Sequence, residues 1–224
     1  MKKKEQGKIP AKFAIAELFA SIQGESSCSG KFCFFIRLAG CNLKCKWCDS
    51  KYAARAKYFL SIEQIISRAV KSGAEIIEIT GGEPLLNPHT PLLCEKLLSK
   101  RFKVLIETNG SLDIGKIPQQ VKIILDCKCP SSGEKDKMLF ANFAKIKGKD
   151  EIKFVVADEK DYIYAKTIIE KFKLFEKTNN IFFSPILTKI KPALLAEWMI
   201  KDKSKATLAI QLHKIIWGKN AKGK

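Results

Sequence analysis

Runs of apolar and β-branched residues alternate along the chain with segments whose apolar residues recur at helical spacing. This alternation is typical of βα units built around a parallel sheet. The apolar runs predict strands over residues 32–38, 75–80, 103–107, 121–126, 151–157 and 181–183, with a last strand near 207–212. The helical spacing predicts one helix that starts at residue 61 and others over 91–99, 160–175 and 191–201.

The clearest predicted helix begins at Ser61, where Ser61 and Gln64 match a capping box, and it stops at Gly73. About six βα units fit into the chain of 224 residues, which is too few for a complete eight-stranded barrel. We therefore predict a single α/β domain over residues 1–224, folded as an open, partial βα barrel. Residues 1–12 and 219–224 are expected to be flexible tails, and the chain is expected to fray from Lys214 onward.

The N-terminus has lysines at positions 2–4 followed by an apolar stretch over residues 13–22, an order that is also found in signal peptides. Glu17 interrupts this stretch, and Gln23-Gly24-Glu25 follows it where a cleavage site would have small residues. No run approaches the roughly 18 apolar residues that a transmembrane helix needs. The sequence therefore predicts a cytoplasmic protein without membrane contact, whose thiols are reduced and available for metal.

The formal net charge is +18, from 41 lysines and arginines against 23 acidic residues. Almost all of the positive charge is lysine, spread along the whole chain without an arginine-rich stripe that has interleaved aromatics. Arginine is the usual choice for bidentate phosphate recognition. The composition thus favours a solvated basic surface, and direct nucleic-acid binding is the disfavoured alternative.

Three cysteines, Cys41, Cys45 and Cys48, lie on one short loop with the spacing Cys-x3-Cys-x2-Cys. A [4Fe–4S] cluster is normally held by four thiolates, so three would leave one iron free to take a substrate or cofactor. The alternative is a structural zinc site, which prefers four ligands and would need Cys127 or Cys129 as the fourth. Structural zinc sites usually show paired Cys-x2-Cys half-sites, so the spacing favours the cluster.

The segment Thr80-Gly81-Gly82-Glu83-Pro84 follows directly on a predicted strand. Two glycines at a strand end let another molecule approach the backbone closely, although an ordinary turn would also explain them. Together with the cysteine loop, this segment resembles the Gly-Gly-Glu element of radical S-adenosylmethionine (SAM) enzymes. The chemistry of α/β sheets sits at the carboxyl ends of the strands, where both motifs fall. The chain is therefore identified as a member of the radical SAM superfamily.

Four further segments narrow the resemblance: Phe19-x-Ser21-Ile22-Gln23-Gly24-Glu25, Phe35-Ile36-Arg37-Leu38-Ala39-Gly40, Trp47-Cys48-Asp49-Ser50 and Gln211-Leu212-His213-Lys214. Together they resemble the 7-carboxy-7-deazaguanine synthases over residues 19–217. An activase of a glycyl-radical enzyme or of anaerobic ribonucleotide reductase shares the cysteine spacing. Such an activase is not expected to carry the Ser-Ile-Gln-Gly-Glu or Trp-Cys-Asp-Ser segments, and a metal-bearing RNA-binding protein remains a third alternative.

The resemblance implies a [4Fe–4S] cluster, SAM and Mg²⁺ as cofactors. It implies reductive cleavage of SAM to a 5′-deoxyadenosyl radical, which takes a hydrogen from C6 of 6-carboxy-5,6,7,8-tetrahydropterin. Rearrangement with loss of ammonia then yields 7-carboxy-7-deazaguanine for queuosine or another deazapurine, and SAM is regenerated. The implied partners are the pterin substrate, a flavodoxin-type reductant and a second copy of the chain in a homodimer.

The resemblance also assigns roles to individual positions. Three cysteines hold the cluster, five residues contact the substrate, five contact SAM, and one hydroxyl coordinates Mg²⁺. The cluster ligands are Cys41, Cys45 and Cys48, and the substrate residues are Ile22, Gln23, Gly24, Arg37 and Thr80. The SAM residues are Gly82, Asp126, Cys127, Lys128 and Ser184, and the Mg²⁺ ligand is Ser50.

The roles of several of these residues can also be argued from the residues alone, without the family resemblance. An arginine within the apolar run 34–38 is costly to bury without an anionic partner, which favours a functional role for Arg37. Gln23 and Glu25 could instead cap the segment after Ile22, and Ser50 could cap the chain that leaves the cysteine loop.

The remaining histidine and cysteines are expected to be structural. His213 is expected to pack or hydrogen-bond instead of binding metal. Buried small residues are expected at Cys28, Cys33, Cys94, Cys127 and Cys129. A second cluster on the last two of these would need further ligands.

Three positions depart from the family pattern. Ser26 stands where a glycine often follows Gln-Gly-Glu, and Ser50 stands where relatives often have threonine. The chain also lacks the proline with which some relatives reach the substrate near the C-terminus. The last departure leaves part of the substrate pocket unassigned.

Overall fold

The computed structural model describes residues 12–218, so the predicted tails lie outside the described residues apart from Lys12. The strands are β1 (Lys12–Ile22), β2 (Phe32–Leu38), β3 (Tyr58–Ser61), β4 (Ile76–Gly81), β5 (Lys103–Thr108), β6 (Lys122–Cys127), β7 (Glu151–Val156), β8 (Ile181–Pro185) and β9 (Thr207–Leu208). The α-helices are α1 (Ile62–Lys71), α2 (Thr90–Ser99), α3 (Glu159–Lys171), α4 (Pro192–Lys201) and α5 (Leu212–Trp217). Short 3₁₀ helices occupy several of the connections.

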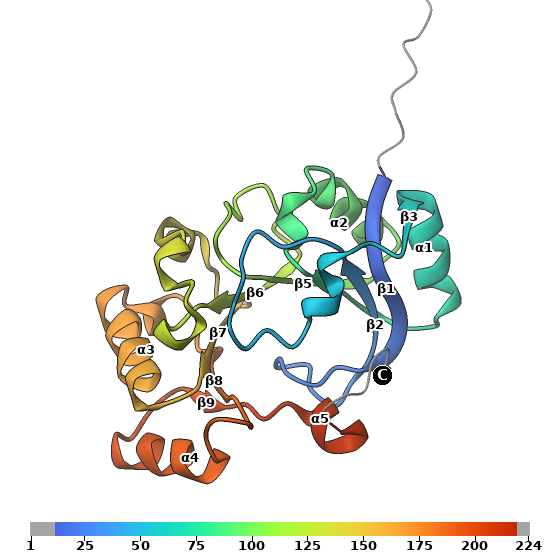
Figure 1. Cartoon of the computed structure of the whole chain (residues 1–224). Helices are drawn as coiled ribbons and strands as arrows, with labels where there is room; N and C mark the ends of the chain where they lie inside the picture. The colour runs from blue at the N-terminus through green and yellow to red at the C-terminus, as the bar shows by residue number, and fades with distance from the viewer. Residues whose placement is uncertain (1–11, 219–224) are drawn as a thin grey trace, which may run out of the picture.

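Within this part of the chain, nine strands form one sheet in the order β3-β1-β2-β4-β5-β6-β7-β8-β9. The pairs from β2 through β9 are parallel, and β1 is antiparallel to both of its neighbours. The sheet curves around a central space, and helices α1 to α4 lie on its outer side (Figure 1). Its two edge strands do not pair with each other. The prediction of an open, partial βα barrel is therefore confirmed.

The predicted strands and helices are present, with boundaries shifted by a few residues. At the predicted first helix, Ser61 accepts a hydrogen bond from the amide of Gln64, and the Gln64 side chain accepts one from the amide of Ser61. The predicted strand 207–212 is shorter, because only Thr207–Leu208 pairs with β8. Lys214, where the chain is expected to begin to fray, lies in α5, and its ammonium contacts Asp49 at 3.0 Å, whereas residues 219–224 lie outside the described residues.

Strands β1 and β3 were not predicted. The stretch that holds Glu17 forms β1 because the charge is paired with Arg37 of the neighbouring strand β2. The outer face of the sheet packs against the helices in the main hydrophobic core. No helix among residues 12–218 is long and apolar enough to cross a membrane.

The five cysteines outside the loop are buried, with at most 2% of their surface exposed. This burial confirms the prediction that they act as small core residues. It also removes Cys127 and Cys129 as a fourth ligand for zinc, because both side chains belong to the hydrophobic core.

Candidate functional site

A cavity of about 1130 Å³ opens at the carboxyl ends of the parallel strands. Its wall includes Arg37 near the end of β2, Thr80 of β4, Glu107 of β5 and Asp126 of β6. This is the edge of an α/β sheet at which ligands are expected. Most of the predicted site residues line this one cavity: Ile22, Gln23, Gly24, Arg37, Cys41, Cys45, Cys48, Ser50, Thr80, Gly82, Asp126 and Lys128.

Two predicted SAM residues do not line the cavity. Cys127 is fully buried in the core, because side chains alternate along β6 and its neighbours Asp126 and Lys128 face the cavity. Ser184 pairs in register with Val155, which does line the cavity, but Ser184 itself is only 2% exposed. The structure therefore brings no side-chain surface of these two residues into the wall.

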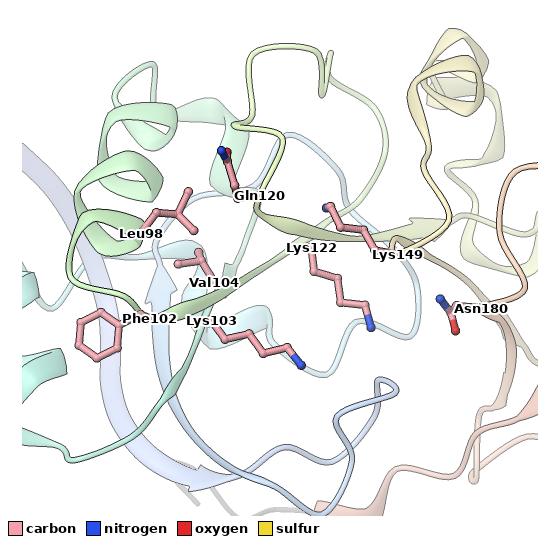
Figure 2. A pocket seen from close by; sticks show the side chains of 8 residues that line it. All are labelled: Leu98, Phe102, Lys103, Val104, Gln120, Lys122, Lys149 and Asn180. Carbon is pink, nitrogen blue, oxygen red and sulfur yellow. The ribbon is translucent and has the colours of Figure 1, made fainter.

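A second cavity of about 270 Å³ lies at the opposite, amino ends of strands β5 to β8. Figure 2 shows the lysine side chains around it, Lys103, Lys122 and Lys149. None of the predicted site residues lines this cavity. Lys122 is already paired with Glu151 at 2.7 Å, so part of its charge is satisfied within the protein.

The three cysteines of the loop face the main cavity, with Cys41 exposed, Cys48 partly buried and Cys45 buried. Among residues 12–218, no three histidine, cysteine or acidic side chains converge closely enough for one metal ion. Three thiols on one loop fit an iron–sulfur cluster, in which each thiolate binds a different iron.

The Gly-Gly-Glu segment packs directly on the entry to the cysteine loop. The amide of Gly82 donates to the carbonyl of Leu38 at 3.0 Å, and that of Glu83 donates to the carbonyl of Gly40 at 2.8 Å. A Cβ at Gly82 would lie 1.8 Å from the Gly40 carbonyl oxygen. The glycine therefore permits two strand ends to meet, and this contact positions the loop.

Glu83 stabilises the contact between the Gly-Gly-Glu segment and the cysteine loop, and its side chain is buried, with 1% of the residue exposed. Its carboxylate accepts hydrogen bonds from the amides of Leu85 and Asn109 and from the hydroxyl of Thr108. These bonds tie the end of β4 to the end of β5. Glu83 is thus a structural member of the motif.

Arg37 has the anionic partner that its apolar surroundings require. Its Nε donates to Glu17 at 2.9 Å, and the Tyr52 hydroxyl donates to the same carboxylate at 2.5 Å. The guanidinium also lies 5.8 Å from the centre of the Phe19 ring. The bond to Glu17 uses Nε, so it does not consume the two terminal nitrogens that form a bidentate fork.

The polar groups of Gln23 are used within the protein. Its side-chain oxygen accepts from the amides of Glu25 and Ser26, and its Nε2 donates to Glu78 at 2.7 Å. Its backbone N–H and carbonyl are both bonded to the loop that ends at Lys31. Gln23 therefore does cap its own segment, and it shapes the cavity wall through this loop.

Asp126 and Lys128 form an ion pair in the wall, with Nζ and Oδ2 separated by 2.8 Å. Lys128 also lies 5.5 Å from the centre of the Trp47 ring and close to Cys45. Burial raises the pKa of the Cys45 thiol, and the charge of Lys128 acts in the opposite direction. This cation therefore favours the thiolate form that metal binding needs.

The other oxygen of Asp126, Oδ1, is buried without a hydrogen-bond partner among the described residues. A buried carboxylate oxygen is costly to leave unpaired, so a bound group with N–H or O–H donors would stabilise it. SAM carries such donors on its amino group and ribose. The residues present therefore fit SAM in this part of the cavity.

Sequence reasoning missed a charged cluster in the inner wall, formed by Glu25, Glu78, Glu107 and Lys153. The Lys153 ammonium contacts Glu25 at 2.9 Å, contacts Glu107 directly and lies 3.9 Å from Asp126. Lys153, like Arg37, is a charged residue within an apolar run, and burying such a charge requires an anionic partner. That signal was available in the sequence at residue 153.

The C-terminal helix α5 completes one side of the cavity. The amide of Leu212 donates to the carbonyl of Gly24 at 2.8 Å, and His213 packs so closely that a Cβ on Gly24 would lie 2.3 Å from its Nδ1. The structure thus places His213 in a packing role and also in the cavity wall.

Ser50 lies at the start of the 3₁₀ helix Lys51–Ala54 but makes no side-chain capping bond. Its hydroxyl donates to Asp49 at 3.0 Å instead. The capping explanation of Ser50 is therefore not supported by its side chain.

Comparison with known proteins identifies the superfamily to which this chain belongs. Residues 35–131 match the radical SAM superfamily, and this span holds both the cysteine loop and the Gly-Gly-Glu segment. The open barrel and the cysteine-lined cavity are those of a radical SAM enzyme, a class that uses a [4Fe–4S] cluster and SAM.

Individual relatives then define the family. The chain is 41% identical to the 7-carboxy-7-deazaguanine synthase of Chlorobaculum tepidum, over 93% of this chain and 96% of the relative. It is 40% identical to the enzyme of the same name from Clostridium acetobutylicum, over 94% and 99% of the two chains. The crystal structure of QueE from Escherichia coli, 24% identical, shares the fold with a TM-score of 0.74 over 90% and 95% of the two chains. The chain belongs to the 7-carboxy-7-deazaguanine synthase family.

Proposed function

We propose that this protein converts 6-carboxy-5,6,7,8-tetrahydropterin to 7-carboxy-7-deazaguanine with release of ammonia, for queuosine or another deazapurine. The observation that carries the proposal is the meeting of the cysteine loop, Arg37 and a buried carboxylate cluster in one cavity. Matches along nearly the full chain to synthases of this activity support it. The same matches favour the synthase over an activase or an RNA-binding protein.

In this proposal the residues that line the cavity have distinct roles. Cys41, Cys45 and Cys48 would hold the cluster, which together with SAM would supply the radical that abstracts hydrogen. Asp126 and Lys128 hold SAM, and Arg37 holds the carboxylate of the substrate. Enclosure by the loop after β1 and by α5 keeps water and other hydrogen donors away from the reacting atoms.

The test is anaerobic incubation of the reconstituted protein with dithionite, SAM and the carboxypterin, followed by mass spectrometry. We expect 7-carboxy-7-deazaguanine in amounts well above the enzyme concentration and dependent on SAM. Failure to form it while SAM is cleaved would contradict the proposed substrate. Transfer of a radical to a partner protein's glycine would support an activase instead.

The Arg37→Lys variant tests the carboxylate contact. Lysine keeps the charge but loses the planar fork. Because a hydrogen bond to a charged group contributes about 1.5–3 kcal/mol, we expect kcat/KM to fall about tenfold or more. Iron content should match the wild type, because Arg37 contacts no cysteine of the loop. Equal rates for the two proteins at subsaturating substrate would assign Arg37 to structural pairing with Glu17 alone.

We further propose that Ser50 supplies an oxygen ligand to a Mg²⁺ ion that also binds the substrate. Its hydroxyl and the Asp49 carboxylate both lie in the cavity wall, and oxygen is the ligand that Mg²⁺ prefers. We expect wild-type turnover to rise with Mg²⁺ and the Ser50→Ala variant to lose most of this response. SAM cleavage should persist in the variant, and an unchanged Mg²⁺ response would remove Ser50 from the site.

The surroundings of the cavity support the proposed partners and location. The exposed lysines Lys44, Lys46 and Lys51 lie within or next to the cysteine loop and would attract an acidic reductant of the flavodoxin type.

The exposed Ile215 and Ile216 of α5 form an apolar surface that a second copy of the chain would cover in a homodimer. All eight cysteines are free, which supports a reducing, cytoplasmic location.

A further inference from the structure

Glu78 lies in the middle of β4, and its side chain lines the floor of the cavity. The residue is only 2% exposed. Its neighbours in register on the two adjoining strands are Phe35 of β2 and Leu105 of β5, both buried. The carboxyl group therefore sits on an apolar floor, where burial disfavours a charge.

The hydrogen bonds of Glu78 leave one oxygen available. Oε2 accepts from the amide nitrogen of Gln23 at 2.7 Å. Over residues 12–218, no hydrogen bond engages Oε1 of Glu78. Oε1 is also absent from the fully buried polar atoms that lack a partner, so it retains contact with the cavity.

The titratable groups around Glu78 come from four segments of the chain. Glu25 follows β1, the Cys33 thiol projects from β2, Glu107 comes from β5 and Lys153 from β7. The single ammonium of Lys153 contacts Glu25 and Glu107 but not Glu78. The ammonium also lies 3.9 Å from Asp126, so Glu78 is the carboxyl group of this cluster that has no ion pair with it.

Burial and the charge of Glu107 raise the pKa of Glu78 to about 8. Gln23 and Lys153 act in the opposite direction but do not cancel these effects. The raised pKa agrees with the geometry, because a neutral carboxyl at Glu78 adds no further negative charge beside Glu25, Glu107 and Asp126.

We propose that Glu78 works as a neutral carboxyl whose Oε1 donates a hydrogen bond to an acceptor atom of the substrate heterocycle. This inference rests on the proposed function and names a further substrate-binding residue for it. Glu25 and Glu107 pair with the ammonium of Lys153, and a carboxylate can only accept hydrogen bonds. Glu78 would therefore select a ring that presents an acceptor to the floor, and it would add no repulsion toward the substrate's own carboxylate.

The first experiment compares wild type, Glu78→Gln and Glu78→Ala in substrate KM and in equilibrium substrate binding at pH 7 and 9. Wild-type binding should weaken about tenfold over this range, since a group with a pKa near 8 loses most of its proton there. Glu78→Gln keeps a neutral donor and should bind with little pH dependence. Glu78→Ala should bind more weakly at both pH values.

A second experiment needs neither substrate nor cluster. A folded-state pKa above the unfolded value gives stability that is complete below about pH 4.3 and is lost as the pH rises through about 8. The melting temperature of Glu78→Gln relative to wild type should therefore increase between pH 5 and pH 9. The exposed Glu63→Gln variant serves as a control and should show no such trend.

Identical pH profiles of substrate binding in wild type and Glu78→Gln would overturn the inference. A constant difference in melting temperature would overturn the neutral carboxyl, and tight binding by Glu78→Ala would overturn the hydrogen bond to substrate. If the wild type forms no product from the carboxypterin, the proposed function fails and the substrate contact fails with it. The melting series separates that case, because it reports the charge of Glu78 alone.

Discussion

Replacing Cys45 with alanine should abolish both the iron–sulfur cluster and the cleavage of SAM. Anaerobically reconstituted wild-type protein should hold about four irons and four sulfides per chain. The variant removes the buried member of the three loop thiols, and the described structure offers no fourth thiol in the cavity wall to replace it. Iron analysis, visible absorbance and the yield of 5′-deoxyadenosine measure the effect.

Cys94→Ala is the matched control for this substitution. Cys94 is fully buried in α2 and does not line the cavity, so its removal should leave iron content and absorbance at wild-type levels. A wild-type cluster in Cys45→Ala would contradict the assignment of the loop.

Replacing Lys153 with methionine should destabilise the fold by about 3–5 kcal/mol, because it leaves buried carboxylates without their cation. Lys153 is 7% exposed, and its ammonium lies between Glu25 and Glu107. The loss in free energy of unfolding should be large at pH 7.5 and smaller at pH 5, where carboxylates freed of the cation take up protons more readily. Chemical denaturation at the two pH values measures it.

The control is Lys166→Met, which breaks a more exposed pair between Lys166 and Asp202. A surface pair of this kind contributes at most about 1 kcal/mol. Equal losses for the two variants, or a Lys153→Met loss that does not depend on pH, would show that the cluster around Lys153 does not depend on its charge.

The sequence was sufficient for the parallel part of the sheet, because each of its buried strands is a short apolar run bounded by turns. It failed for β1, where Glu17 breaks the apolar pattern. The ion pair that makes this strand possible joins Glu17 to Arg37, twenty residues further along the chain. A charge within a strand gives no sign of its partner until the pairing of strands is known.

In the candidate site, the motifs whose residues lie close together in sequence were predicted, and the charged cluster whose residues lie on separate strands was missed. The three cysteines and the two glycines are close in sequence, so their spacing alone indicated their chemistry. Glu78, Glu107 and Lys153 each look like an interruption in a separate strand. Lys153 meets Glu107 across 46 residues of chain and Glu25 across 128, and only the register of the sheet brings them together. Cys127 shows the same dependence on the sheet, since its immediate neighbours line the cavity while its own side chain lies in the core.

The seating of α5 on the loop after β1 has a consequence for biosynthesis. The contacts that join Leu212 to Gly24, Gln211 to Glu25 and Lys214 to Asp49 link the last helix of the described chain to segments made near its beginning. On the ribosome the cysteine loop emerges early, whereas the residues that close the cavity beside it emerge after every strand of the sheet. These three contacts can form only after α5 has left the ribosome, so the wall beside the cysteine loop is completed at the end of synthesis of the described chain.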